Sequence, residues 1–245
     1  MRDFQKPGRS AVYADNGMVA TSHPLAAQTA IRLLQDGGNA VDAAIGAAVL
    51  LGLCEPQMTG LGGDLFALIK PAGDERIVAL NGSGRAPAAL DVEAMRALGP
   101  SVPVYGVEAV TLPGAVDAFC RLNADWGMLD LAQTLAPAIH YFDAGVPVAP
   151  RVARDWAEAG HLQHEARRHF LPGGTAPRAG DRFALPGQAE VLRRIARDGR
   201  AGFYEGEVAE DMVATLQALG GAHTLDDFAA VACDYSEPVS GQYRG

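Results

Sequence analysis

Residues 40–54 constrain the fold more than any other segment, because they are made almost entirely of alanine, valine, isoleucine, leucine and glycine. Asp42 and two glycines interrupt this apolar run, which is shorter than the roughly 20 residues that a bilayer-spanning helix needs. Asn39 can cap a helix here, and Asp42 falls in its first turn, where a carboxylate favours the positive end of the helix dipole. A helix that is apolar nearly all round has to be covered on every side. The segment therefore predicts a buried helix inside a sizeable core.

Strands and a further helix are predicted around this buried helix. Residues 17–22 are rich in valine and threonine, which is typical of a strand. Residues 25–35 carry apolar side chains at three- and four-residue spacings, and Gly37-Gly38 follows as a C-cap would, so they predict a helix. After the buried helix, residues 65–70 and 76–80 predict the two strands of a β-hairpin, joined by a short loop that contains glycine.

From about residue 92 onward the sequence predicts mainly helices, separated by proline and glycine. No period of 20 to 50 residues recurs, so a repeat array is excluded. Residues 240–245 look like the start of a strand. The predicted helices cover residues 116–126, 131–143, 152–170, 188–198, 207–219 and 225–230.

Charge and cysteine content exclude several classes of protein. The 245 residues include 20 Lys+Arg and 29 Asp+Glu, a net charge of -9 without a basic run, which argues against binding to the phosphate backbone of nucleic acids. Cys54, Cys120 and Cys233 show neither metal-site spacing nor an even disulfide set, so we expect reduced, mostly buried thiols in a cytosol-like compartment. Residues 1–7 lack the apolar stretch of a secretory signal. We therefore expect a cytoplasmic protein without a membrane partner.

Common catalytic motifs fit the sequence poorly. The glycine-rich turn at 60–63 lies between a predicted helix and a strand, the reverse of a dinucleotide-binding fingerprint. Ser83 lies between two glycines, but Asn81 and Arg85 occupy the outer places where a nucleophile elbow needs glycine, so Ser83 is interpreted as a turn residue. No cationic partner near the three cysteines would activate a thiolate.

A histidine-rich segment at 158–169 also fails as a metal site. His164 and His169 are five residues apart, which places them about 140 degrees apart around a helix, too far to share one zinc ion. We interpret the segment as a solvated amphipathic face and expect no metal. Its other polar members are Glu158, His161, Glu165, Arg167 and Arg168.

Arg85 is the strongest binding candidate from the residues alone. Its guanidinium directly follows a Gly-Ser-Gly turn and precedes Ala86-Pro87, which holds it on a stiff loop at the end of a predicted strand. Such a place suits bidentate recognition of a carboxylate, whereas a single loop arginine is more often a surface ion-pair residue. Both interpretations stay open at this point.

Several motifs taken together resemble the large-subunit region of the γ-glutamyltranspeptidase family. The resemblance follows the family's order over almost the whole chain. Its most specific part is the GGNAVDAA block, followed about twenty residues later by the glycine-rich turn. In chain order the motifs are GGNAVDAA at 37–44, Glu55-Pro56, TGLGGD at 59–64, Ala86-Pro87, Leu112-Pro113-Gly114, Phe203-Tyr204-Glu205-Gly206 with Ala209, and SGQYRG at 240–245.

This resemblance implies an N-terminal-nucleophile hydrolase of the α+β class, with an αββα sandwich that is incomplete in this chain and a mostly helical second half. It implies one incomplete large-subunit unit over residues 1–245, with sandwich-layer helices and strands in 15–90 and a mainly helical region in 91–245. Such enzymes are zymogens that cut themselves into a large and a small subunit. The threonine freed at the start of the small subunit attacks the γ-glutamyl amide, its own amine acts as the base, and the acyl-enzyme passes to water or an acceptor amine. Backbone amides of the small subunit would form the oxyanion hole.

Two departures from the family pattern shape the expected site. The chain ends before the small subunit, so we expect no catalytic residue within it. The arginine that grips the substrate α-carboxylate in well-known members lies four residues before the Ala-Pro proline, where this chain has Ser83, and Arg85 lies two positions later. We expect both residues to bind substrate. The threonines outside any processing context are Thr21, Thr29, Thr59, Thr111, Thr134, Thr175, Thr215 and Thr224.

The loop NGSGRAP at 81–87 is similar to that of a family branch which includes γ-glutamyltransferase-like hydrolases and cephalosporin-acylase-like amidases. Three hypotheses follow. The protein is a cofactor-free γ-glutamyl amide hydrolase or transferase of glutathione-like substrates, partnered by the small-subunit polypeptide from the same precursor. Alternatively, it is an acylase that acts on glutaryl-like side chains, or the chain is a non-catalytic truncated remnant.

Overall fold

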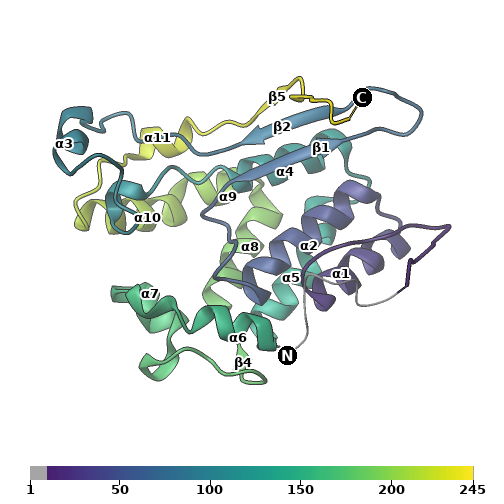
Figure 1. The fold of residues 1–245 in the computed structure, drawn as a ribbon, viewed down its shortest axis with the longest axis horizontal. Helices are drawn as coiled ribbons and strands as arrows, with labels where there is room; N and C mark the ends of the chain where they lie inside the picture. The colour runs from purple at the N-terminus through teal and green to yellow at the C-terminus, as the bar shows by residue number, and fades with distance from the viewer. Residues whose placement is uncertain (1–9, 245) are drawn as a thin grey trace.

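The computed structural model describes residues 10–244 and begins with two paired helices (Figure 1). Both were predicted, and they span α1 (Pro24–Gln35) and α2 (Ala40–Cys54). The strand predicted at residues 17–22 is wrong: the segment has no strand partner among the described residues, and nearly all its side chains are exposed, so no ladder forms. Residues 1–7, where the sequence predicts no secretory signal, lie outside the described residues.

Helix α2 is the buried centre of the molecule, as its apolar sequence predicts. It lies between α1 and α5 (Leu131–Ala144), and α4 (Ala115–Trp126) also packs on it (Figure 1). A Cβ on Gly46 would overlap the end of the Leu33 side chain of α1 and press on the Thr134 carbonyl oxygen of α5. The close approach of the two helices thus depends on the small residues in the apolar run.

Asp42 holds the N-terminus of α2 against the α4–α5 connection. Asn39 caps the helix as predicted, and Asp42 completes a capping box by accepting a hydrogen bond from the Asn39 amide (2.9 Å). The carboxylate is fully buried and also accepts from the amides of Met128 (2.9 Å) and Leu129 (3.4 Å) and from the side chain of Asn123 (3.3 Å). A buried carboxylate is tolerated only when it is bonded in this way.

The main sheet has three antiparallel strands in the order β1 (Leu65–Ile69), β2 (Val78–Gly82) and β5 (Asp234–Ser236). The predicted hairpin is confirmed, with Leu65 paired to Gly82 and Ile69 to Val78. Strand β5 was not predicted, because three residues of mixed polarity carry no periodic signal. It joins the sheet from the far end of the chain.

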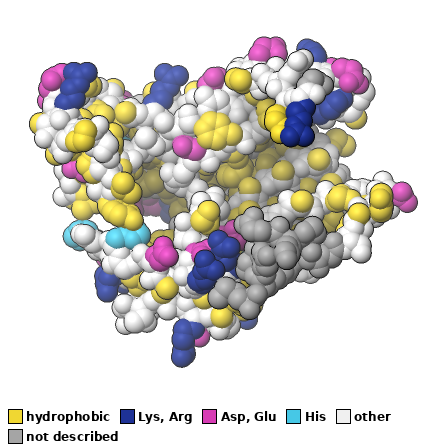
Figure 2. Space-filling view, viewed as in Figure 1, with side chains coloured by type: hydrophobic (Ala, Val, Ile, Leu, Met, Phe, Trp, Pro, Cys, Tyr) yellow, Lys and Arg dark blue, Asp and Glu magenta, His cyan; other side chains and the backbone are white. Residues whose placement is uncertain are grey.

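The two faces of the sheet have different surroundings. Leu80 is buried on the inner face, which packs against α4, and Tyr235 of β5 lies on the same face. Phe66 and Leu68 project from the opposite face, and each is 70% exposed. Figure 2 shows hydrophobic side chains gathered in the hollow between the sheet layer and the helices α1 and α2. One face of the sheet therefore lacks cover within the described residues.

Most of the second half of the chain is helical. The predicted helices at 116–126, 131–143, 188–198, 207–219 and 225–230 are confirmed within one or two residues, and the division near residue 90 stays a prediction. The remaining elements are α3 (Val92–Ala97), η1 (Val107–Ala109), β3 (Val146–Pro147), α6 (Pro150–Trp156), η2 (Ala159–His161), α7 (His164–Phe170), η3 (Pro172–Gly174), β4 (Arg182–Phe183), α8 (Pro186–Asp198), α9 (Ala201–Tyr204), α10 (Gly206–Ala218) and α11 (Leu225–Ala229).

Two further predictions are corrected. The single helix predicted at 152–170 is broken into α6, η2 and α7, because the indole nitrogen of buried Trp156 donates to the carbonyl oxygen of Phe170 (2.9 Å), which requires the chain to fold back. His164, at the start of α7, has a left-handed φ of 49°. Residues 240–244 form no strand, and the pairing with β2 falls earlier, at Asp234–Ser236. No described helix has the length and apolarity to cross a membrane.

We expect Asp42→Ala to lower the free energy of unfolding by about 3 kcal/mol or more, because several buried donors lose their acceptor at once. Urea denaturation followed by circular dichroism measures this change. Asp36→Ala is the matched control, since among residues 10–244 the Asp36 side chain forms only an exposed pair with Arg32 that contributes roughly 0.2–1 kcal/mol. Equal effects of the two substitutions would contradict the structural role of Asp42.

Candidate functional site

Three loops meet at one end of the hairpin and form the candidate site. Residues 60–64 make the glycine-rich turn before β1, residues 81–87 continue from the end of β2, and residues 111–114 lead into α4. Because the strands are antiparallel, the start of β1 pairs with the end of β2, which brings the first two loops to the same edge of the sheet.

Backbone hydrogen bonds join the three loops directly. The carbonyl oxygen of Gly63 accepts from the amides of Gly114 (3.0 Å) and Ala115 (2.9 Å), two of the donors that the start of α4 leaves free. The amide of Leu112 donates to the carbonyl oxygen of Arg85 (2.9 Å). The conformation of each loop therefore depends on the other two.

The loops touch so closely that only glycine fits at two of their positions. A Cβ on Gly84 would overlap the carbonyl oxygen of Leu112, and a Cβ on Gly114 would overlap that of Gly82. These contacts explain why Gly84 and the Leu112-Pro113-Gly114 motif occur where they do. They also fix the backbone on which Ser83 and Arg85 stand.

Two side-chain oxygens brace the loop that carries Arg85. Asp64 Oδ1 accepts a hydrogen bond from the amide of Gly84 (2.7 Å), and Asn81 Oδ1 accepts from the amide of Ser83 (3.0 Å). Asp64 ends the TGLGGD motif, and no role for its side chain was predicted from the sequence. Its position directly after the glycine-rich turn is the signal that was available, because a short acidic side chain there can accept from a neighbouring loop.

The structure places the two predicted binding residues on this one loop, and both are exposed. The side chain of Arg85 forms no ion pair or hydrogen bond within the described part of the chain. The interpretation of Arg85 as a surface ion-pair residue is therefore unsupported, since no carboxylate of the described chain pairs with it. Its role in binding substrate, and that of Ser83, stays a prediction.

The far end of the loop is tied to α11. Asp227 accepts a hydrogen bond from the amide of Ala88 (3.0 Å), next to the buried Pro87, and another from the hydroxyl of Thr224 (2.7 Å), the residue that caps α11. Burial opposes ionisation of Asp227, but these hydrogen bonds outweigh it and lower the pKa of the carboxyl. The loop thus ends on a fixed ionised group.

Tyr204 is hydrogen-bonded to the loop at residues 111–114. Its hydroxyl donates to the carbonyl oxygen of Pro113 (2.7 Å) and accepts from the amide of Asp117 (3.0 Å), so it joins the Phe-Tyr-Glu-Gly motif to the Leu-Pro-Gly motif. The residue is almost fully buried, and burial raises the pKa of the phenol. Tyr204 therefore stays protonated and acts as a structural donor.

Asp117, in the first turn of α4, connects this network to the end of the chain. It accepts from Arg200 (2.8 Å) and from the amide of Cys233 (2.7 Å), just before β5. Burial opposes its ionisation, but the Cys233 amide and the Arg200 guanidinium together lower the pKa of Asp117. Asp117 thus ties the residue before β5 to the first turn of α4, a contact that was not predicted from the sequence.

The three cysteines are free, as expected, although only Cys54 is fully buried and Cys120 and Cys233 are partly so. Burial raises the pKa of each thiol to about 12, so each is neutral near pH 7. Their environment matches the packing role that the sequence suggested.

The histidine-rich segment shows no metal geometry. His161 lies in η2 and His164 and His169 in α7, and all three side chains are exposed. Glu165 forms ion pairs with Arg168 and His169 on the same helix. Within residues 10–244, no group of three or more His, Cys, Asp or Glu side chains is arranged to hold a metal ion.

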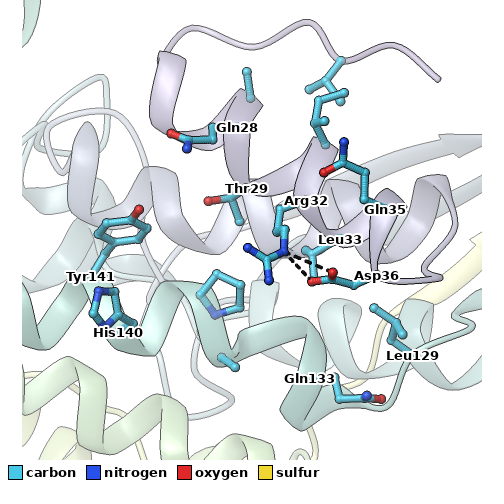
Figure 3. Close-up of a pocket in the computed structure, with 15 residues that line it drawn as sticks. Gln28, Thr29, Arg32, Leu33, Gln35, Asp36, Leu129, Gln133, His140 and Tyr141 are labelled. Carbon is cyan, nitrogen blue, oxygen red and sulfur yellow. Dashed lines mark hydrogen bonds and ion pairs between the residues drawn. The ribbon is translucent and has the colours of Figure 1, made fainter. Parts of the chain in front are cut away.

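A groove of about 920 Å³ lies between α1 and α5 and shares no residue with the three loops (Figure 3). Gln28, Gln133 and His140 line it, as do Arg32 and Asp36, which form an ion pair with each other (Figure 3). The groove therefore offers polar side chains to a ligand, but the charge of Arg32 is already paired with that of Asp36.

Known proteins are similar to this chain over nearly its whole length. The family model described as gamma-glutamyltranspeptidase matches residues 26–245. The glutathione hydrolase-like YwrD proenzyme of Bacillus subtilis is 36% identical over 96% of this chain and 45% of its own length. Among solved structures, the gamma-glutamyltranspeptidase of Helicobacter pylori has a TM-score of 0.90 at 30% identity, covering 96% of this chain and 70% of that one.

A second solved structure, the cephalosporin acylase of Bacillus halodurans, also has a TM-score of 0.90, at 42% identity over 99% of this chain and 47% of that one. The chain thus spans about half the length of the YwrD proenzyme and of this acylase. These matches confirm the predicted fold class, an N-terminal-nucleophile hydrolase fold of the α+β type with a mostly helical second half.

We expect Gly84→Ala to destabilise the protein by about 2 kcal/mol or more, because the added methyl group overlaps the Leu112 carbonyl and forces the loops apart. Thermal unfolding measures the effect as a lower Tm. Gly62→Ala, in the neighbouring turn, is the matched control, because a Cβ there meets no atom within 4 Å. A Gly84→Ala protein as stable as the control would show that the loops are not packed as described.

Proposed function

Because the chain belongs to the γ-glutamyltranspeptidase family, we propose that the protein containing it cleaves γ-glutamyl amides, as a hydrolase or transferase, through an acyl-enzyme. The nucleophilic threonine would come from a polypeptide segment outside this chain, and that segment would also provide the oxyanion hole. The chain itself would contribute the carboxylate-binding loop. The observation that carries the proposal is the exposed Arg85, which pairs with no described residue and stands on a loop braced by two other loops.

Arg85 is suited to hold the free carboxylate of the acyl group. A guanidinium has five donors in a planar fork, and it binds a carboxylate through two parallel hydrogen bonds. The hydroxyl of Ser83, two residues earlier, is also exposed and can donate a further bond. Because the loop backbone is fixed by Gly84 and Leu112, little freedom is lost when a substrate binds.

The proposed partner is the small-subunit polypeptide from the same precursor. The exposed side chains of Phe66 and Leu68 form an apolar face on β1, opposite the face that packs on α4. Sheet faces of this kind are normally covered by another layer. A relative named as a proenzyme extends well beyond the matched region, which supports a covering layer from the same gene product.

An acylase acting on glutaryl-like amides is the second candidate. The specific support is the 42% identity to the cephalosporin acylase of Bacillus halodurans, higher than the identity to the Helicobacter pylori transpeptidase. The place of Ser83, where well-known transpeptidases have arginine, agrees with it. A non-catalytic remnant stays a further alternative, and the cytoplasmic location also stays a prediction.

We expect Arg85→Ala in the full-length protein to raise the KM for γ-glutamyl-p-nitroanilide and glutaryl-p-nitroanilide by roughly ten- to a hundredfold. The reason is that each substrate loses a charge-assisted bidentate contact. Butyryl-p-nitroanilide has no carboxylate, so its KM should not change. Arg178→Ala is the control for loss of an exposed loop arginine, because Arg178 pairs with Asp181 instead. An equal rise for all three substrates would contradict carboxylate binding by Arg85.

We expect the full-length gene product to mature into two polypeptides on a denaturing gel, with threonine at the N-terminus of the second. Edman sequencing of the smaller band identifies that residue, and its replacement by alanine should leave one uncut, inactive chain. A full-length protein that turns over substrate without being cut would overturn the proposed threonine mechanism. Hydrolysis by the purified 245-residue chain alone would overturn the placement of the nucleophile outside it.

A further inference from the structure

A second, aromatic-lined pocket of about 580 Å³ lies between the loop before η1, the segment before the glycine-rich turn and the α6–α7 region. We propose that this pocket binds a small aromatic amine in its ammonium form, with the ring inside the pocket and the positive charge beside Glu158. The pocket shares no residue with the three loops of the candidate site, so this inference is independent of the proposed function. Its volume falls within the range of roughly 300–1,000 Å³ that is usual for small-molecule sites.

The inner wall of the pocket is apolar and held rigidly. Trp156 is buried, and its indole nitrogen donates to the carbonyl oxygen of Phe170 (2.9 Å). Its ring also meets that of Phe183 edge-on, with 4.7 Å between the ring centroids. Because other contacts already order these side chains, a flat ring can pack on the wall without a further loss of side-chain entropy.

The outer wall is a pair of stacked rings from two distant segments. The ring of Tyr105, just before η1, lies 4.3 Å from that of His161 in η2, measured between centroids, and the two planes are tilted by 31°. His161 Nδ1 donates to the carbonyl oxygen of Glu158 (3.3 Å), which orients the imidazole. Figure 2 shows histidine side chains in cyan at the edge where α7 lies, with hydrophobic side chains directly above them. Tyr105 is still 65% exposed, so much of its ring can pack on a ligand.

One negative charge at the pocket is not neutralised by the described part of the chain. Two carboxylates line the pocket, and Asp155 pairs with Arg151 (2.7 Å). The exposed Glu158 side chain forms no ion pair or hydrogen bond within residues 10–244. Arg167, on α7, donates to backbone carbonyl oxygens instead. A pocket that combines ring faces with one unpaired carboxylate attracts a cation through both features.

Gln57 adds an unmet hydrogen-bond acceptor to the wall. It lines the pocket, and its side-chain oxygen Oε1 is buried without a donor among the described residues. A buried acceptor without a donor costs free energy, and an N–H group on a ligand would supply what is missing. Indole amines carry such a group on the ring in addition to the ammonium, which makes them the best-matched probes.

Met58 places the pocket next to the candidate site. Its side chain is 72% exposed and lines the pocket, and it lies two positions before Gly60, where the glycine-rich turn begins. With consecutive Cα atoms about 3.8 Å apart, the Cα atoms of Met58 and Gly60 are within about 8 Å. A bound amine would therefore lie beside that turn.

The test measures binding of three indoles to the full-length protein by isothermal titration calorimetry near pH 7. Tryptamine, tryptophol and indole-3-propionate share the ring and carry an ammonium, a hydroxyl and a carboxylate group, respectively. We expect tryptamine to bind roughly tenfold more tightly than tryptophol, and indole-3-propionate to bind most weakly because its charge is repelled by Glu158. Ethylamine has the charge without the ring and should show no saturable binding.

Two substitutions separate the charge from the ring. Glu158→Gln keeps the size of the side chain and should weaken tryptamine roughly tenfold while leaving tryptophol unchanged. Glu165→Gln is its matched control, because Glu165 is an exposed acid on α7 outside the pocket and pairs with Arg168. Tyr105→Ala should weaken both ligands by roughly three- to tenfold. Tyr13→Ala, which removes a ring that is 92% exposed and does not line the pocket, should weaken neither.

The Tm of each variant, measured in parallel, shows that a loss of binding is not a loss of folding. Equal weakening of tryptamine and tryptophol by Glu158→Gln would overturn the ammonium assignment. Tryptamine binding that neither Glu158→Gln nor Tyr105→Ala changes would overturn the location, and no saturable tryptamine binding would overturn the proposal as a whole. None of these results depends on whether the protein cleaves γ-glutamyl amides, because binding is measured without turnover.

Discussion

The buried carboxylate of Asp42 is the interaction on which the arrangement of the helices depends. It joins the capping box of α2 to the backbone of the α4–α5 connection through donors at Asn39, Met128 and Asn123. The side chain of Asn39 adds a bond to the carbonyl oxygen of Trp126 (2.6 Å) at the end of α4. An apolar helix alone could slide or rotate in its core, since hydrophobic burial has no direction. Directed bonds to one buried charge fix its register.

From α4 the constraint passes to the candidate site. The first turn of α4 donates to the Gly63 carbonyl, the hydroxyl of Tyr204 holds Pro113 just before it, and Asp117 ties the same turn to Arg200. The loop with Arg85 is in turn built on these segments through Leu112. The surface loop that carries Arg85 is thus held in place by hydrogen bonds to segments that are anchored in the buried core. Such support by a second layer of contacts is what a binding site needs to hold a charged group ready.

The family motifs have their physical explanation in these same contacts. The GGNAVDAA block supplies the cap, the buried acid and small residues for close helix packing, and the glycine-rich turn supplies the carbonyl that anchors α4. None of these residues needs to touch a substrate. The two exposed positions, Ser83 and Arg85, lie where the pattern departs from well-known transpeptidases. Packing residues therefore indicate the family, whereas substrate specificity is expected to depend on the exposed loop residues.

The sequence by itself determined most of the long helices, the hairpin and the loop that carries Arg85, because caps, periodicity and turn glycines act between residues a few positions apart. It could not determine β5, which pairs with β2 and follows Cys233, whose amide donates to Asp117 of α4. Nor could it determine the break in 152–170, where the indole of Trp156 donates to the Phe170 carbonyl. Nor could it assign Asp64, which meets Gly84 twenty positions away. Only the tertiary structure decides such contacts, because their partners become neighbours only when the chain has folded.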